Sequence, residues 1–237
     1  MIGFISSQYL HRTPTIAIGI MFILVIVYIL TKGINVIART QVVLLYFGIL
    51  LFLFAYFGLT KEIKLDNIKP ILEFGWSPIL KGSISYIAFN TLPLFVLTAI
   101  PKNYVFDNKH YNRNVIITYF LSSITLMLTT FFIISIFGPH LALLYQYPEY
   151  HLLKLINISG FISRVEGIIA LHWLFDLFSF IVMGLYFIIK YIKDDFKMTD
   201  KITNYAIITL SIILLFAVEH IFKNNTIANF IILHYSP

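Results

Sequence analysis

Residues 80–100 read LKGSISYIAFNTLPLFVLTAI, a stretch long enough to cross a bilayer that is interrupted at its middle by FNTLP, residues 89–93. A membrane-spanning helix must satisfy its backbone N–H and C=O groups internally, and a proline removes one donor from that ladder. Polar residues beside a proline at mid-depth therefore predict a helix that is broken near residues 89–93. Many transporters build their substrate sites at such breaks.

The composition of the whole chain is that of a membrane protein. Hydrophobic residues make up 59% of the 237 residues and charged residues 12%, against roughly one-quarter charged residues in soluble domains. The net charge of +6 comes from Lys and Arg between apolar runs, where anionic lipid headgroups of the bilayer are the expected counter-charge. We therefore expect no nucleic-acid partner. The sequence holds no cysteine, which excludes a thiolate metal site or a cysteine nucleophile within it.

Apolar runs of about 20 residues, the length that crosses a bilayer, recur along the chain. The expected spans are residues 15–30, 42–59, 80–100, 115–137, 168–189 and 204–222, with a partial seventh at 227–235. The predicted fold class is an all-α polytopic transmembrane helical bundle in a single membrane domain, residues 1–237. The last apolar piece has only about half the length of a span, so we expect the chain to be cut inside a helix. Lys and Arg number nine on one set of connectors and eight on the other, which leaves the membrane orientation undecided.

The sequence contains NIKP at residues 67–70, GWSPILKG at 75–82, FISRVE at 161–166, and Gly33 followed by Ala38-Arg39. Together these elements resemble the spore germination permeases. Residues 66–101 contain an N-hydrophobic-x-P element followed by a G-x-x-P-I-L-K-G element, as before the sixth helix of that family. Residues 161–178, FISRVEGIIALHWLFDLF, resemble the F-x-x-R-x-E start of its eighth helix, with Trp173 where a tryptophan is usual. Gly33, followed by Ala38-Arg39, resembles the short turn between its fourth and fifth helices.

The resemblance implies the membrane B subunit of a germinant receptor, within the amino acid, polyamine and organocation transporter superfamily. Such proteins are expected to have ten helices in two inverted repeats, with helices one and six broken at a central site. On this mapping the six spans are helices four to nine, and residue 227 begins helix ten. Helices one to three would precede Met1, so we expect a fragment, a truncated gene product, or a separate polypeptide that supplies the rest.

The same resemblance implies the partners and the location of the protein. The partners would be the A and C subunits of the receptor and a small amino-acid-like ligand, and the location would be the inner membrane of a spore. No cofactor and no metal are expected.

The interrupted span carries the first candidate ligand-binding residues. Asn90 and Thr91 can donate hydrogen bonds to an amino acid and accept them from it, while Tyr86 and Phe89 would form an apolar wall. The alternative is a simple proline kink, in which Asn90 and Thr91 bond to their own or a neighbouring helix.

The fifth span carries the second candidate pair. His172 and Asp176 are four residues apart, so they lie on one face of a helix. An ionisable side chain in a span costs about 2.5–3.5 kcal/mol on insertion scales and indicates function by default. Asp176 could bind the ammonium group of a ligand or accept a proton, with His172 as its partner; alternatively, the two only stabilise helix packing. Arg164 and Glu166, at the start of this span, form a candidate gate or structural latch.

Several functions stay open at this point. A germinant-receptor subunit and a proton- or ion-coupled amino acid transporter can use the same kind of site. An intramembrane enzyme using His172 and Asp176 is disfavoured, because the sequence has no G-x-S-x-G motif and no cysteine. An assembly subunit that binds no ligand is the remaining class. We expect a protein that is not an enzyme.

Overall fold

The computed structural model describes residues 2–70, 73, 75–100, 104–105, 109–156 and 166–221. For nine residues within these ranges the structure describes the backbone and not the side chain: Ala88, Phe89, Leu92, Glu166, Ile168, Ile169, Ala170, His172 and Ile221. The described residues form helices and no strand, which confirms the predicted all-α fold class.

The described helices follow one another with short connections. In chain order they are α1 (Ile2–Gln8), α2 (Thr15–Lys32), α3 (Ile34–Leu59), the 3-10 helices η1 (Thr60–Glu62) and η2 (Leu65–Ile68), α4 (Ser77–Leu97), α5 (Tyr111–Leu144), α6 (Pro148–Leu153), α7 (Glu166–Asp195) and α8 (Asp200–Ile221).

Five described segments are long and apolar enough to cross a membrane. They are Thr15–Lys32, Ile34–Glu62, Tyr111–Leu144, Trp173–Asp195 and Asp200–His220. They correspond to all the predicted full spans except residues 80–100. That remaining span corresponds to α4, which contains side chains outside the description, so its crossing of the membrane stays a prediction. Residues 227–235 lie outside the described part of the chain.

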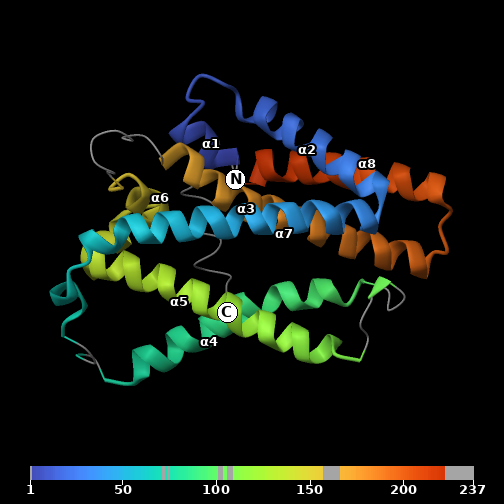
Figure 1. The fold of residues 1–237 in the computed structure, drawn as a ribbon. Helices are drawn as coiled ribbons and strands as arrows, with labels where there is room; N and C mark the ends of the chain where they lie inside the picture. The colour runs from blue at the N-terminus through green and yellow to red at the C-terminus, as the bar shows by residue number, and fades with distance from the viewer. Residues whose placement is uncertain are drawn as a thin grey trace. The chain divides into compact units, whose positions relative to one another are not determined.

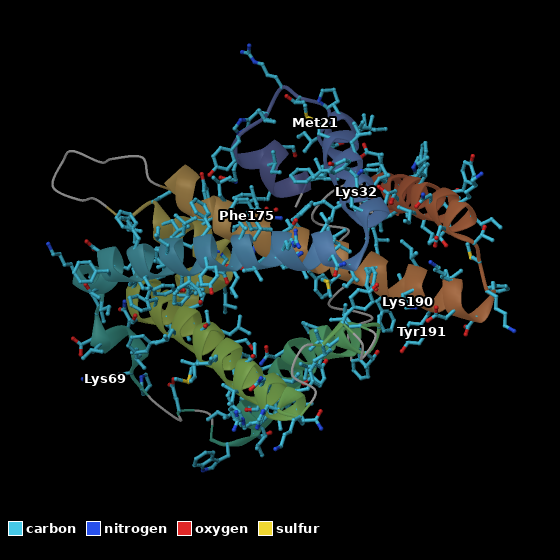
Figure 2. All side chains as sticks on the ribbon, turned by 45° about the vertical axis from the view of Figure 1, so that its right-hand side comes forward. Met21, Lys32, Lys69, Phe175, Lys190 and Tyr191 are labelled. Atoms are coloured by element: carbon cyan, nitrogen blue, oxygen red, sulfur yellow. The ribbon has the colours of Figure 1, made fainter. Side chains whose placement is uncertain are left out.

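Large apolar side chains point outward from these helices. Met21 on α2, labelled in Figure 2, is 70% exposed, and Phe57 at the end of α3 is 84% exposed. Soluble monomers rarely expose extended apolar patches, whereas lipid tails cover such surface in a bilayer. The outward side chains therefore agree with membrane-spanning helices.

The turn between α2 and α3 needs its glycine. Gly33 has a φ of 82°, and its N–H donates to the carbonyl of Leu30 at 3.1 Å. Side chains other than glycine adopt such a φ only with strain, so Gly33 ends one helix and lets the next begin at Ile34.

Helix α4 contains the residues at which the sequence predicts a broken span. It runs from Ser77 to Leu97 as one helix with Pro93 inside it, so the described backbone has no gap over residues 89–93. A helix can pass through a proline and lose one backbone hydrogen bond, here the bond to the carbonyl of Phe89. In this structure Pro93 removes one backbone hydrogen bond from α4, and a break of the helix at residues 89–93 stays a prediction.

The non-helical residue inside a described helix lies instead in α5. Gly138 has a φ of 75° and a ψ of 164°, and Pro139 follows it. Together they kink α5 near its C-terminal end, because Pro139 has no N–H to donate and Gly138 turns the backbone out of the helical conformation.

The chain divides into two compact units. The first unit comprises the described parts of Met1–Val42, Pro93–Ile100 and Leu177–Pro237. In it α2 and α8 lie side by side (Figure 1), and Thr15 Oγ1 donates to Glu219 Oε1 at 2.8 Å.

Two further contacts hold the first unit together. A Cβ atom added at Gly19 of α2 would overlap Leu215 Cδ1 of α8, so the glycine allows the close approach of these helices. After α4, the hydroxyl of Thr98 lies 3.1 Å from that of Tyr191 on α7, which is labelled in Figure 2.

The second unit comprises the described parts of Val43–Leu92 and Pro101–Asp176. Its buried cluster joins α3, α5 and residues 148–156, which we call the α6 region. The cluster consists of Ala55, Leu59, Phe132, Ile136, Leu152 and Ile156. At the edge of this cluster Tyr56 donates its hydroxyl hydrogen to Thr129 Oγ1 at 2.6 Å. All of the predicted ligand-binding residues fall in this second unit.

Candidate functional site

The polar residues of α4 lie against α5. Asn90 donates from Nδ2 to Ser123 Oγ, and Tyr86 donates from its hydroxyl to the carbonyl of Ser123 at 2.9 Å. The hydroxyls of Thr91 and Tyr119 lie 3.4 Å apart. Ser123 in turn donates to the carbonyl of Tyr119 at 2.9 Å. We call these five residues the α4–α5 polar cluster.

Burial of the cluster is greatest at Asn90, whose exposed fraction is 9%, whereas Tyr86 is 37% exposed. An amide in an apolar environment requires hydrogen-bond partners, and Ser123 supplies one. An asparagine amide has two donor hydrogens and an acceptor oxygen, so this bond uses only part of its capacity. The arrangement can therefore hold two helices together and also offer hydrogen bonds to a small polar ligand.

Ser123 and Tyr119 were missed by sequence reasoning. Both lie on α5, four residues apart and hence on one helical face, within a span that was taken as apolar. The signal that could have found them is this i, i+4 pair of hydroxyl-bearing residues. Their contact with α4 depends on packing between segments 33 residues apart, as for Asn90 and Ser123.

The second candidate pair lies on α7. His172 and Asp176 both belong to this continuous helix, so their four-residue spacing places them on one face. Asp176 is exposed and interacts with another group of the protein. The side chains of His172 and Phe89, two of the predicted site residues, lie outside the described part of the structure.

Aromatic contacts fix the neighbours of this pair. Trp173 packs edge-to-face against Tyr147, with ring centroids 5.7 Å apart. Phe175, labelled in Figure 2, lies 5.8 Å from Phe47 of α3, measured between ring centroids. The N-terminal part of α7 is thus held within the second unit by two ring contacts.

The candidate gate is only partly described. Arg164 lies outside the described residues, and Glu166 is the first described residue of α7 with its side chain excluded. Its role as a gate or latch stays a prediction. Among the described residues, no group of three His, Asp or Glu side chains could hold a metal ion.

Comparison with known proteins identifies the family. The family described as "Spore germination protein", a permease family, matches residues 1–226. The chain belongs to this spore germination family. No solved structure matches the chain.

Curated members of the spore germination family share between a quarter and a third of the aligned residues. Putative spore germination protein YfkT of Bacillus subtilis (strain 168) is 31% identical over 190 residues, which cover 79% of this chain and 51% of that protein. Spore germination protein XB of Bacillus anthracis is 28% identical over 182 residues, 77% of this chain and 50% of that protein. Spore germination protein KB of Bacillus subtilis (strain 168) is 28% identical over 184 residues, 74% of this chain and 48% of that protein.

The chain spans about half the length of these curated relatives. Family membership, together with five described helices that are long and apolar enough to cross a membrane, makes this an integral membrane protein of a spore-forming bacterium.

Proposed function

We propose that the protein is the membrane subunit of a spore germinant receptor, binds a small amino-acid-like germinant in a permease-type site, and triggers germination. Its partners on this proposal are the A and C receptor subunits, and its location is the inner membrane of the spore. Membership of the spore germination family supports this role, and so do the names of the curated relatives XB and KB.

The observation that carries the proposed site is the α4–α5 polar cluster within otherwise apolar helices. Asn90 provides an amide and Thr91 a hydroxyl, and these groups match the carboxylate and ammonium of an amino acid. Asp176 on α7 belongs to the same unit and supplies the negative charge that an ammonium group requires. Tyr86 and Phe89 contribute the aromatic wall.

Substitution of the two polar residues tests this site. Spores carrying Asn90→Ala or Asp176→Asn should fail to respond to a panel of small amino acids that germinate the parent spores, because each variant removes a ligand contact. Immunoblots of the spore membrane should show normal amounts of both proteins. Normal dose–response curves for both variants would refute the assignment.

Two control variants separate ligand binding from packing. Ser123→Ala removes the α5 partner of Asn90 but leaves the amide in place, so its spores should retain a response that Asn90→Ala abolishes. Asp195→Asn changes an exposed carboxylate at the far end of α7 and should leave the response unchanged. If Ser123→Ala and Asn90→Ala behave alike, Asn90 serves helix packing.

Coupled transport of an amino acid is the second candidate, and the carboxylate of Asp176 inside an apolar helix favours it. The two functions differ in whether binding drives alternating access or shifts a signalling equilibrium. Proteoliposomes containing the protein should bind a radiolabelled germinant without accumulating it under a proton gradient. Gradient-dependent accumulation that Asp176→Asn abolishes would favour the transporter.

A further inference from the structure

The connector between α3 and α4 makes a set of hydrogen bonds with α5 that the proposed ligand site does not use. Asn67 in η2 donates from Nδ2 to the carbonyl of Ser135 at 2.9 Å and to that of Ile136 at 3.1 Å. The backbone N–H of Lys64 also donates to the carbonyl of Ser135, at 3.1 Å. Asn67 is the first residue of the N-hydrophobic-x-P element, residues 67–70, and it contacts the two carbonyls just before the kink of α5.

These two carbonyls need partners from outside the helix. The carbonyl of Ser135 would normally accept from the N–H of residue 139, which is a proline and has none. Ile136 lies in the same turn, where Gly138 leaves the helical conformation. Ser135 is fully buried and Ile136 is 9% exposed, so solvent cannot readily replace the missing donors.

The position of the kink determines where the following segment lies. After Gly138 the chain continues to α6 and places Leu152 in the buried cluster of the second unit. Just before α6, Tyr147 packs against Trp173 of α7. Trp173 is adjacent to His172 and three residues from Asp176, so the α6 region borders the second half of the candidate site.

We infer that Asn67 is a positioning residue: by capping the carbonyls of Ser135 and Ile136 it fixes the direction of α5 after Gly138, and thereby the contact of Tyr147 with Trp173. Its relevance to germinant binding rests on the proposed function, whereas the positioning itself does not. Asparagine suits the role because one planar NH₂ group can donate two hydrogen bonds to two neighbouring carbonyls. An aspartate of the same shape has no donor when ionised and would place a negative charge beside both oxygens.

Fluorescence of Trp173 tests the positioning without any ligand. The sequence contains two tryptophans, and the other, Trp76, is 68% exposed and can be replaced in a Trp76→Phe background. In membranes, Asn67→Asp and Asn67→Ala should shift the Trp173 emission maximum and change its quenching by a water-soluble quencher. Asp66→Asn is the matched control on the same 3-10 helix, since the Asp66 side chain is 93% exposed and forms an ion pair with Lys69 at 3.1 Å. Unchanged emission in both Asn67 variants would overturn the inference.

A cysteine pair gives a second test of the contact, with the single variant Gly138→Cys as its reference, because any side chain is strained at the φ of 75° that Gly138 adopts. A Cβ atom added at Gly138 would lie 3.9 Å from Asn67 Cβ, within the range of disulfides, and the sequence has no native cysteine. The double variant Asn67→Cys and Gly138→Cys should form a disulfide under mild oxidation, and Asp66→Cys with Gly138→Cys should not. The oxidised pair should keep Trp173 emission near the parent value, and reduction should shift it towards that of Asn67→Ala.

The outcomes separate this inference from the proposed function. Failure of the Asn67–Gly138 pair to cross-link in the membrane would overturn the contact, and identical emission in the oxidised and reduced states would overturn the positioning role. Both measurements omit germinant, so loss of the receptor assignment would leave them unaffected.

Discussion

Asn90 is an amide in an apolar helix, and its side chain bonds to Ser123 on the neighbouring helix. In a bilayer such an interhelical hydrogen bond contributes about 0.6 kcal/mol to stability on average. The hydrogen bond to Ser123 therefore stabilises helix packing only slightly. Among the described residues the bond to Ser123 uses one donor hydrogen of the Asn90 amide, and its remaining donor and acceptor could bind a ligand. The decisive comparison is therefore between Asn90→Ala and Ser123→Ala.

Another single residue leads to a prediction on pH. His151 in α6 stacks on Tyr145 with ring centroids 4.3 Å apart, and burial together with the nearby charge of Lys154 lowers the pKa of His151 below its ordinary value of 6.5. The folded protein thus favours neutral His151. Neutral His151 therefore contributes to the free energy of unfolding. This contribution is fully present above pH 6.5, the ordinary pKa that the unfolded chain retains, and is lost as the pH falls through the lower pKa of the folded protein.

We therefore expect the melting temperature in detergent to fall between about pH 7.5 and about pH 5, and to fall less in His151→Gln, which does not titrate. His11→Gln changes an exposed histidine and should melt like the parent protein at both pH values. An equal fall in the parent protein and in His151→Gln would contradict this prediction.

At the scale of the elements, glycine and proline decide where helices end or bend. Gly33 separates α2 from α3, and Gly138 with Pro139 kinks α5. Pro93, by contrast, lies inside a continuous α4. The difference is that Gly138 adopts a non-helical backbone conformation before its proline, whereas Pro93 removes only one hydrogen bond.

The pairing of α2 with α8 gives a prediction on helix packing. Gly19→Val should lower the stability of the protein by about 1–3 kcal/mol, because its side chain would overlap the end of the Leu215 side chain and force that leucine to repack. Thermal unfolding in detergent measures the change. Gly184→Val on α7 is the control, since a Cβ atom added there meets nothing within 4 Å. Equal melting temperatures for both variants would show that α2 and α8 do not pack through Gly19.

At the scale of the whole molecule, the open question is whether α4 crosses the membrane like the five spanning helices. Residues of α4 contribute to both compact units, with the boundary between Leu92 and Pro93. Lys69 precedes this helix and Lys109 follows it, and both are exposed. If α4 spans the bilayer, these two positions face opposite compartments.

Labelling of single cysteines tests that topology. Lys69→Cys and Lys109→Cys should react with a membrane-impermeant maleimide from opposite sides of the spore membrane, as measured on intact and inverted vesicles. Lys197→Cys, in the turn between α7 and α8, should react on the same side as Lys109→Cys, because α5 and α7 lie between them. Reaction of Lys69→Cys and Lys109→Cys on one side would show that α4 does not cross.

Much of this fold could be predicted from local sequence. Apolar runs of span length predicted five helices that the structure contains, and their ends differ mainly because polar residues such as Asn35 and Asp194 continue the helix beyond the apolar run. Sequence reasoning named Asn90 and Thr91 but not the α5 hydroxyls that they contact, and the role of these residues in ligand binding stays a prediction. The sequence left open whether Pro93 bends the helix or breaks it, because a proline inside an apolar run is compatible with both.

The sequence alone predicted the long apolar helices, the turn at Gly33 and the family elements. Each of these depends on residues that are close together in the chain. Only the tertiary structure decided which side chains of different helices contact one another. Asn67 meets Ser135 across 68 residues and Asn90 meets Ser123 across 33, and such pairs exist only once the helices have packed. Hydrogen-bond partners inside a membrane protein follow from which helices are neighbours, and hydropathy carries no information on that choice.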